Sequence, residues 1–347
     1  QSRRTRALRD VDIGLRHIEL VVPVDRIRCD TCGLVEVVMA LARPHARCTR
    51  RLERRLYELT ASMTVKAVAK LMQLDWDTVR DAEKRYIRGA LRARKLDGIT
   101  RLGFDEVSYK RGHRYLTLVT DLDGRRVIYV TQNRDGMAVK RFLRWFGKRR
   151  SRRVKVVVTD MHDPYVSVLR KRLPKAKLVY DHFHVSKLLH EALDEIRRRI
   201  QRHLPARDRK IIKGKRYVLL RGTERLTDAQ RVSLGELLAV NADLMAAYVL
   251  KEAFRDVFRA PTRKSGARRL EEWKAQATES NVPELAGVVA MLTRRHDGVM
   301  NFFEHRVSNG MAEGFNNVVG TLRKQAYGFR DREYLRLKIL RICGKLP

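Results

Sequence analysis

The order of apolar segments between residues 99 and 200 is the feature that most constrains the fold of this chain. Three segments rich in β-branched and aromatic residues, at 101–109, 115–121 and 127–132, predict strands, and Asp123-Gly124 favours a hairpin turn between the last two. The segments that follow alternate between helix and strand patterns, at 138–146, 154–159, from Pro164 onward, 177–180 and 184–200. The predicted order is therefore βββαβαβα.

This order predicts an α/β fold. Three antiparallel strands followed by alternating helices and parallel strands form a mixed sheet covered by helices, as in a ribonuclease-H-like fold. The stretch 201–290 is basic and helical, apart from a strand signal at 217–220. Helical patterns then return at 294–304, 311–324 and 332–342. We therefore expect a core formed by 99–200 and 291–347, interrupted by a mostly helical insertion at 201–290.

Carboxylates stand where such a sheet would bring them together. Asp105 lies in the first predicted strand, and Asp160 ends the fourth, which runs beside the first in this topology. Glu106 alternates to the opposite face of the strand, so only one of the two neighbours can join Asp160. Glu313 lies near the start of a later helix, in a segment whose glycines allow close approach. Oxygen ligands of this kind suit Mg²⁺ or Mn²⁺.

The net charge predicts a polyanionic partner. The chain has 347 residues, with 76 Lys and Arg against 40 Asp and Glu, which gives a formal net charge of +36. A positive potential of this size attracts nucleic acid, because Arg and Lys bind phosphate. No run approaches the roughly 18 apolar residues of a membrane helix, and only four cysteines occur. We expect a soluble protein of a reducing, intracellular compartment, with no membrane partner.

Residues 51–98 carry the pattern of a helix-turn-helix module. Thr64 and Asp75 are expected as N-caps of two helices separated by a short turn. Ala67, Val68 and Leu71 would face Val79 across that turn. The groove-reading residues expected on the exposed face of the second helix are Asp77, Thr78, Arg80 and Lys84. Two packed helices of an ordinary bundle would give a similar pattern.

Residues 1–50 predict a small β module. Alternation over 11–28 favours a hairpin that runs into Cys29 and Cys32, and this spacing places two thiolates on one side of a Zn²⁺ ion. One pair supplies half of a tetrahedral site. The other half would come from His45 and Cys48, or from a pair upstream of Gln1, since a chain that starts at Gln has lost residues in this interpretation. Two reduced structural cysteines are the alternative.

Several motifs together resemble one protein family. The segments 103–109 with 112–117, 160–161, 181–185, 309–316 and 326–330 closely resemble the bacterial insertion-sequence transposases of the ISL-three family. These motifs keep one order over more than two hundred residues, and the resemblance covers nearly the whole chain. One departure is that members of this type usually carry two Cys pairs, whereas only Cys29 and Cys32 stand here. This favours an N-terminal truncation of a zinc-ribbon module.

The resemblance implies a transposase with a DDE catalytic triad. Asp105, Asp160 and Glu313 take the triad positions and would hold two Mg²⁺ ions for in-line phosphoryl transfer. Water cuts the strand at the transposon end, and the freed 3′-OH then attacks target DNA, without a covalent intermediate between protein and DNA. The implied partners are double-stranded DNA with terminal inverted repeats, target DNA, and a second copy of the chain, as a dimer or larger assembly on the bacterial nucleoid.

We also expect roles for four further residues that accompany the family motifs. His184, at the start of a long helix, would contact the scissile phosphate or organise a carboxylate, and a packed or capping histidine is the alternative. Asn316, one turn beyond Glu313, would hydrogen-bond a water on the metal or hold the helix. Arg323 and Lys324 on the same helix would contact the DNA backbone.

Two other functions share parts of this pattern. A catalytically silent DNA-binding regulator derived from a transposase would keep the helix-turn-helix, but the intact Asp105, Asp160 and Glu313 argue against it. A metal-dependent DNA nuclease would use all the same site residues and would lack only the joining step. Strand transfer by a supplied 3′-OH end distinguishes the nuclease from the transposase.

Overall fold

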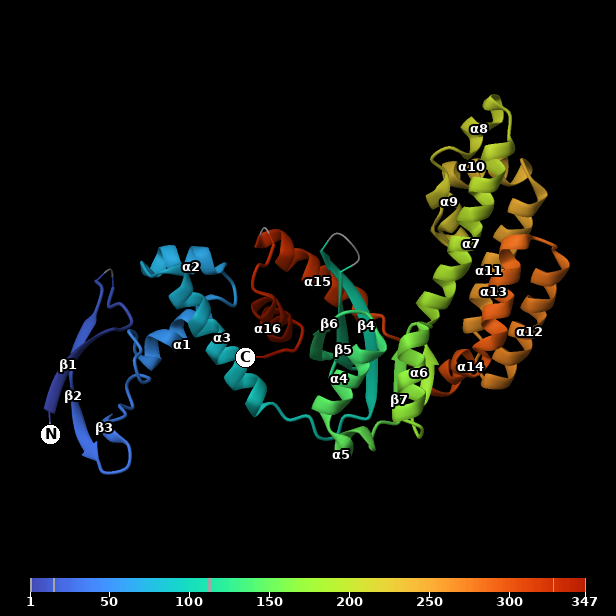
Figure 1. The fold of residues 1–347 in the computed structure, drawn as a ribbon. Coiled ribbons are helices and arrows are strands. Elements are labelled where there is room, and N and C mark those ends of the chain that lie inside the picture. Colours follow the sequence, from blue (N-terminus) through green and yellow to red (C-terminus); the bar gives the residue numbers. More distant parts are fainter. Residues whose placement is uncertain (1, 15, 111–113, 327, 347) are drawn as a thin grey trace. The chain divides into compact units, whose positions relative to one another are not determined.

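The chain forms two compact units in a computed structural model that describes residues 2–14, 16–110, 114–326 and 328–346. The core unit comprises Leu96–Asn317, and the terminal unit comprises Gln1–Lys95 together with Val318–Pro347 (Figure 1). Residues 318–347, which the sequence analysis groups with 99–200, fall in the terminal unit in this division. No helix in the part of the chain that the structure describes is long and apolar enough to cross a membrane.

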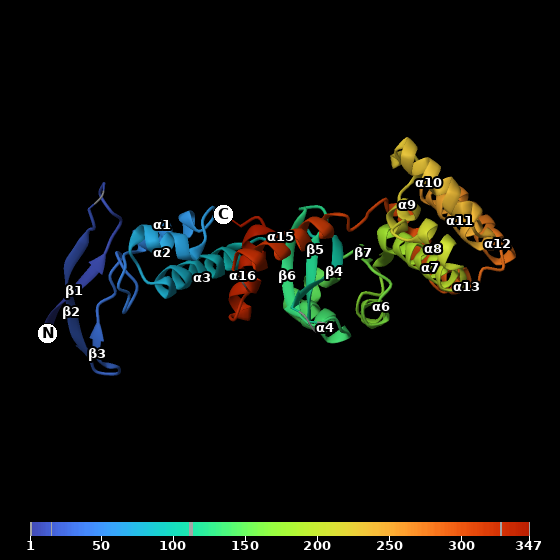
Figure 2. The same ribbon diagram turned by 90° about the horizontal axis from the view of Figure 1, so that it is seen from above.

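A five-stranded mixed sheet organises the core unit. Its strands stand in the order β6-β5-β4-β7-β8, which Figure 2 shows for the first four. The antiparallel strands β4 to β6 span Arg101–Lys110, Arg114–Asp121 and Arg126–Gln132. Strands β7 (Val156–Thr159) and β8 (Lys177–Tyr180) run parallel to β4. The predicted mixed sheet and its strand order are therefore confirmed.

Helices cover both faces of this sheet, as the alternating pattern predicts. One face packs against α4 (Gly136–Phe146) and α6 (Asp163–Arg172), around Phe104, Phe142 and Tyr165, and the short α5 (Lys148–Ser151) follows α4. The other face packs against α7 (His182–His203) and α14 (His296–His305), around Val158 and Tyr180. Gly298 permits the close approach of α14, because a Cβ there would lie 2.2 Å from the Tyr180 ring.

The stretch between α7 and α14 is helical, with one correction to the prediction. Its helices are α8 (Ala206–Ile212), α9 (Arg216–Leu220), α10 (Asp228–Ala239), α11 (Ala242–Phe258), α12 (Arg263–Glu279) and α13 (Pro283–Arg294), with a 3₁₀ turn at Thr223–Arg225. The strand predicted at 217–220 is wrong, since these residues form α9. The buried Lys251 ammonium donates to the carbonyls of Leu219 and Arg221, at 2.9 and 2.7 Å. The carbonyl groups at the end of α9 therefore have a hydrogen-bond donor without a neighbouring strand.

The terminal unit contains the predicted pair of helices. Helices α1 (Arg50–Leu59), α2 (Val65–Met72) and α3 (Trp76–Ala93) pack around Leu52, Val68 and Val79. Thr64 caps α2, and the turn to α3 passes through Gln73 with a φ of 49°. Asp75 stands at the N-cap of α3 without a capping hydrogen bond. The inward position predicted for Leu71 is wrong: its side chain is 56% exposed, and Met72 packs in the core.

Helix α16 (Arg332–Ile342) completes the core of the terminal unit through one buried carboxylate. Glu83 of α3 is fully buried and accepts from Arg341 at 2.6 Å, from Lys338 at 2.8 Å and from the Tyr334 hydroxyl. Arg341 also donates to the Thr60 hydroxyl at 2.8 Å. Cations from α16 therefore neutralise a carboxylate that α3 alone would leave buried and unpaired.

A three-stranded sheet replaces the predicted hairpin at 11–28. Strand β1 (Ser2–Arg9) pairs with β2 (Glu19–Cys29), which pairs with β3 (Gly33–Glu36). Residues 10–18 connect β1 and β2, so the first half of the predicted hairpin is wrong. The reason lies at Asp10, which is buried and accepts from Thr49 and Arg51, both at 2.6 Å. This anchoring takes the chain out of the sheet after Arg9.

Candidate active site

Asp105 and Asp160 lie on adjacent parallel strands. Gly103 of β4 pairs with Val158 of β7, so each aspartate stands two residues further along its strand direction. Asp105 is largely buried, and its pKa is raised, first by burial and also by the negative charge of Asp160. The Asp160 carboxylate accepts from the His162 backbone N–H at 3.1 Å. The sheet thus brings two carboxylates within electrostatic reach of each other.

Two residues from other helices approach Asp105. Helix α15 (Met311–Gln325) supplies Asn316, whose side-chain amide donates to Asp105 Oδ2 at 2.9 Å. His184 in the first turn of α7 places its Nε2 3.8 Å from Asp105 Oδ1. Asn316 therefore holds the carboxylate directly, while the His184 ring lies beyond direct hydrogen-bonding distance.

Glu313 lies on the same helix as Asn316, one turn earlier, and its side chain is exposed. Residues three apart on a helix lie on neighbouring positions of one face. The described residues contain no group of three His, Cys, Asp or Glu side chains arranged to hold a metal ion. The structure thus sets the Glu313 helix against the Asp105 strand without closing the three carboxylates around one point.

An asparagine that the sequence reasoning missed anchors the segment before α15. Asn309 is 4% exposed; its backbone N–H donates to Asp181 Oδ2 at 3.0 Å, and its side-chain amide donates to the Phe104 carbonyl at 3.2 Å. Gly103 makes room for it, because a Cβ there would lie 2.6 Å from Asn309 Oδ1. This anchor fixes the start of α15 beside the residue that precedes Asp105. The motif at 309–316 was the only sequence signal for it.

Glu106 lies on the opposite face of β4 from Asp105, as the alternation predicts. The negative charges of Asp160 and Asp105 nevertheless act on its pKa. Its Oε2 pairs with Arg134 at 3.1 Å. Burial, followed by the charge of Asp160, raises the pKa of Glu106 to about 7. Its Oε1 is buried without a hydrogen-bond partner among the described residues.

The oxygen atoms around the two aspartates fit a hard cation. Buried side-chain oxygens without a hydrogen-bond partner in the described chain include those of Thr159, which precedes Asp160, and Asn316, whose amide donates to Asp105. Carboxylate and amide oxygens are the ligands that Mg²⁺ and Mn²⁺ prefer. The donor set therefore suits these ions.

The residues expected to read DNA differ in exposure and in their ion pairs within the protein. Asp77 and Thr78 lie in the first turn of α3. Arg80 lies over the Trp76 ring and pairs with Asp77 and Asp81. Lys84 is only 13% exposed and pairs with Asp331 at 2.9 Å and with Glu333 at 3.2 Å. Its charge is thus engaged inside the terminal unit.

The basic pair on α15 lies in the last turn of that helix, at Arg323 and Lys324, and the Lys324 side chain is exposed. Three residues of the family motifs, Gly112, His113 and Tyr327, lie outside the described residues.

The cysteine positions separate the two ways of completing a zinc site. Cys29 and Cys32 flank the turn between β2 and β3, and backbone N–H groups of Thr31 and Cys32 lower the pKa of the Cys29 thiol. Cys48 is buried in the apolar core around Leu52, where burial raises the pKa of its thiol. A thiol in such surroundings does not favour metal binding.

Comparison with known proteins identifies the family. A family described as "Transposase" matches residues 102–339, and the "Helix-turn-helix domain of transposase family ISL3" matches residues 41–87. The chain is 32% identical over 341 residues to the transposase for insertion sequence element IS1001 of Bordetella parapertussis, covering 96% of this chain and 83% of that protein. It is 30% identical over 374 residues to the transposase for insertion sequence element IS1557 of Mycobacterium tuberculosis, covering 99% and 82%.

The first match spans the sheet, the helical stretch and α15, and the second spans the helices that pack around Val68 and Val79. With both matches, the chain belongs to the ISL3 family of insertion-sequence transposases and carries its helix-turn-helix DNA-binding domain.

Proposed function

We propose that this protein cuts and joins DNA strands at the ends of an insertion sequence, with Asp105, Asp160 and Glu313 as the metal-binding triad. The core unit would be a ribonuclease-H-like core interrupted by the helices between α7 and α14. The observation that carries the proposal is the 2.9 Å hydrogen bond from Asn316 to Asp105, because it brings the Glu313 helix to the Asp105 strand. Closure of Glu313 onto the two aspartates would accompany binding of DNA and cations.

The residues of the chain have separate tasks in this proposal. Asp105 and Asp160 would hold Mg²⁺ or Mn²⁺ ions, two in all, together with Glu313. When bound, such ions stabilise the charge that develops on the attacking and leaving oxygens of a phosphoryl transfer. Asn316 orients the Asp105 carboxylate through its amide N–H. His184, whose Nε2 lies 3.8 Å from Asp105 Oδ1, would donate to a phosphate oxygen.

DNA would enter through the exposed start of α3. Asp77 and Thr78 remain as candidate groove-reading residues, and Lys66 and Lys70 of α2 are exposed as well. Lys84 would act within the protein, through Asp331 and Glu333. We further propose that the module recognises terminal inverted repeats, that Lys324 meets the DNA backbone, and that two or more copies assemble on the paired ends. Cys29 and Cys32 would bind Zn²⁺ only with ligands from outside this sequence.

A cleavage assay on the flanking repeats of the encoding element tests the proposal. Asp105→Asn is expected to abolish Mg²⁺-dependent cleavage and to leave binding of the repeat duplex within about twofold, because the carboxylates and the helix-turn-helix lie in different units. Asp123→Asn is the matched control, since Asp123 lies in a hairpin of the same sheet and pairs only with Arg101 in the described structure. Equal cleavage by all three proteins would remove Asp105 from the site.

A second measurement separates a transposase from a nuclease. A pre-cut repeat end with a free 3′-OH, incubated with plasmid DNA and Mg²⁺, is expected to become joined to the plasmid. Cleavage without joining would support hydrolysis alone.

A further inference from the structure

The core unit has a strongly basic surface at the end of the sheet opposite the carboxylates. We call it the basic edge and define it by eight exposed side chains: Lys148, Arg149, Arg152, Arg153, Lys155, Arg172, Lys175 and Lys177. They lie on α5, at the end of α6, and at the starts of β7 and β8. The starts of the two strands are joined directly, since the Lys177 N–H donates to the Lys155 carbonyl at 2.8 Å.

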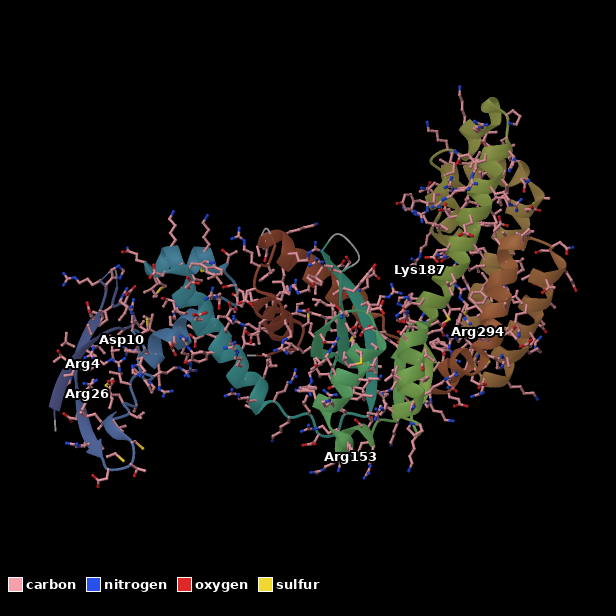
Figure 3. The ribbon with its side chains drawn as sticks, in the orientation of Figure 1. Arg4, Asp10, Arg26, Arg153, Lys187 and Arg294 are labelled. Atoms are coloured by element: carbon pink, nitrogen blue, oxygen red, sulfur yellow. The ribbon has the colours of Figure 1, made fainter. Side chains whose placement is uncertain are left out.

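The charge of the basic edge is not balanced locally. The segments 136–159 and 164–180 contain fourteen Lys and Arg and no Asp or Glu. Arg150 within this stretch pairs with Asp97, but none of the eight side chains of the basic edge has an ion pair among the residues that the structure describes. Figure 3 shows Arg153 at this end of the core unit, surrounded by side chains that end in nitrogen.

Several basic side chains elsewhere in the core unit do pair with acids, in contrast to those of the basic edge. In α12 and its surroundings, Arg259 pairs with Asp256, Arg263 with Glu304 and Arg268 with Glu272. An array of unpaired cations on adjoining elements creates the potential that binds a chain of phosphates.

The direction of the strands separates the basic edge from the candidate active site. Lys155 precedes β7 and Asp160 follows it, so the two lie at opposite ends of a four-residue strand. At about 3.3 Å per residue, such a strand is about 13 Å long. The cations at its start therefore lie at the opposite end of the strand from Asp160.

We propose that the basic edge binds the phosphate backbone of a second DNA duplex, distinct from the one whose strand reaches the carboxylates of the same copy. The choice of DNA as the polyanion rests on the proposed function. Because the cations contact phosphates and not bases, this binding is independent of sequence. The surface would hold the duplex while the helix-turn-helix of the terminal unit reads a specific site.

Binding of the 347-residue chain to a labelled 30-base-pair duplex of random sequence tests the proposal. The edge variant carries Arg152→Gln, Arg153→Gln, Lys155→Gln and Lys175→Gln. The control variant carries Arg225→Gln, Arg259→Gln, Arg263→Gln and Arg268→Gln, which remove the same charge from positions that already pair with acids. Each phosphate contact contributes about 0.9 to the slope of log K against log [salt], so the edge variant should lose up to about 3.6 from this slope.

A bridging assay tests whether the duplex is a second one. Protein bound to a bead-attached duplex is offered a free fluorescent duplex. Wild type and control variant should capture it, and the edge variant should stay on the beads but capture at least tenfold less. An unchanged salt slope, or equal capture by the edge variant, would overturn the proposal. Asp105→Asn should bridge like wild type, so failure of the catalytic proposal alone leaves this result intact.

Discussion

The hydrogen bonds of Asn309 allow us to predict how substitutions there change the free energy of unfolding and how that change depends on pH. Asn309→Ala removes the amide that donates to the buried Phe104 carbonyl and keeps the backbone bond to Asp181. Leaving a buried acceptor unsatisfied costs about 1–3 kcal/mol. Asn309→Asp is nearly isosteric but replaces the donor by an oxygen 3.2 Å from the same carbonyl. It also adds a charge near Asp181, so we expect a loss of about 3 kcal/mol or more at pH 8.

The sign of the pH effect distinguishes these two variants. Burial and the charge of Asp181 raise the folded-state pKa of the introduced carboxyl above its unfolded value of about 3.9. The penalty of Asn309→Asp is therefore small below about pH 4 and grows as the pH rises through the folded-state pKa. The penalty of Asn309→Ala does not involve a proton and should stay constant.

Urea unfolding followed by tryptophan fluorescence measures both effects. A Trp76→Phe background leaves Trp145 and Trp273 as reporters, and both lie in the core unit. With a slope of about 2 kcal/mol/M, a loss of 2 kcal/mol moves the midpoint by about 1 M. The reasoning would be refuted if both variants unfolded at the wild-type midpoint at pH 8. It would also fail if the penalty of Asn309→Asp did not change with pH.

Three further predictions concern contacts described above. Arg341→Met should lower the stability of the terminal unit by about 3–5 kcal/mol, because Glu83 then loses a buried cation; equal thermal unfolding of variant and wild type would contradict this. Lys84→Gln should lower the stability of the same unit by about 1 kcal/mol and change the affinity for repeat DNA less than twofold, as measured by anisotropy, whereas a DNA-contacting lysine would show the reverse pattern. Asn316→Leu should weaken Mn²⁺ binding, measured by electron paramagnetic resonance, by about tenfold, since the orientation of Asp105 is lost; unchanged binding would show that Asn316 only packs.

The sequence predicts the parts of the fold that depend on local patterns. Strands at 101–109, 115–121 and 177–180 and the helix at 332–342 are confirmed nearly to the residue, because alternation and helical periodicity are strong there. The failures have tertiary causes. The segment 217–220 is rich in strand-forming residues, yet Lys251 from α11 satisfies its carbonyls as a helix.

The candidate site also contains residues that local patterns predict and residues whose roles depend on contacts distant in sequence. Asp105 and Asp160 follow from strand order, since adjacent parallel strands bring them together. Lys84 has the spacing of a groove-reading residue, and only contact with Asp331, 247 residues away, shows that its charge is engaged. Asn309 was missed for the same reason: its partners Phe104 and Asp181 are far from it in sequence.

The buried carboxylate of Glu83 makes the packing of the helix-turn-helix depend on a helix that is synthesised much later. Helix α3 leaves the ribosome about 250 residues before α16, which at about 5–20 residues per second is a delay of some 12–50 seconds. Until α16 arrives, the helix-turn-helix holds an acid without its cations. A nascent chain can therefore complete the buried ion pairs of its helix-turn-helix only after residues 96–317 have been synthesised.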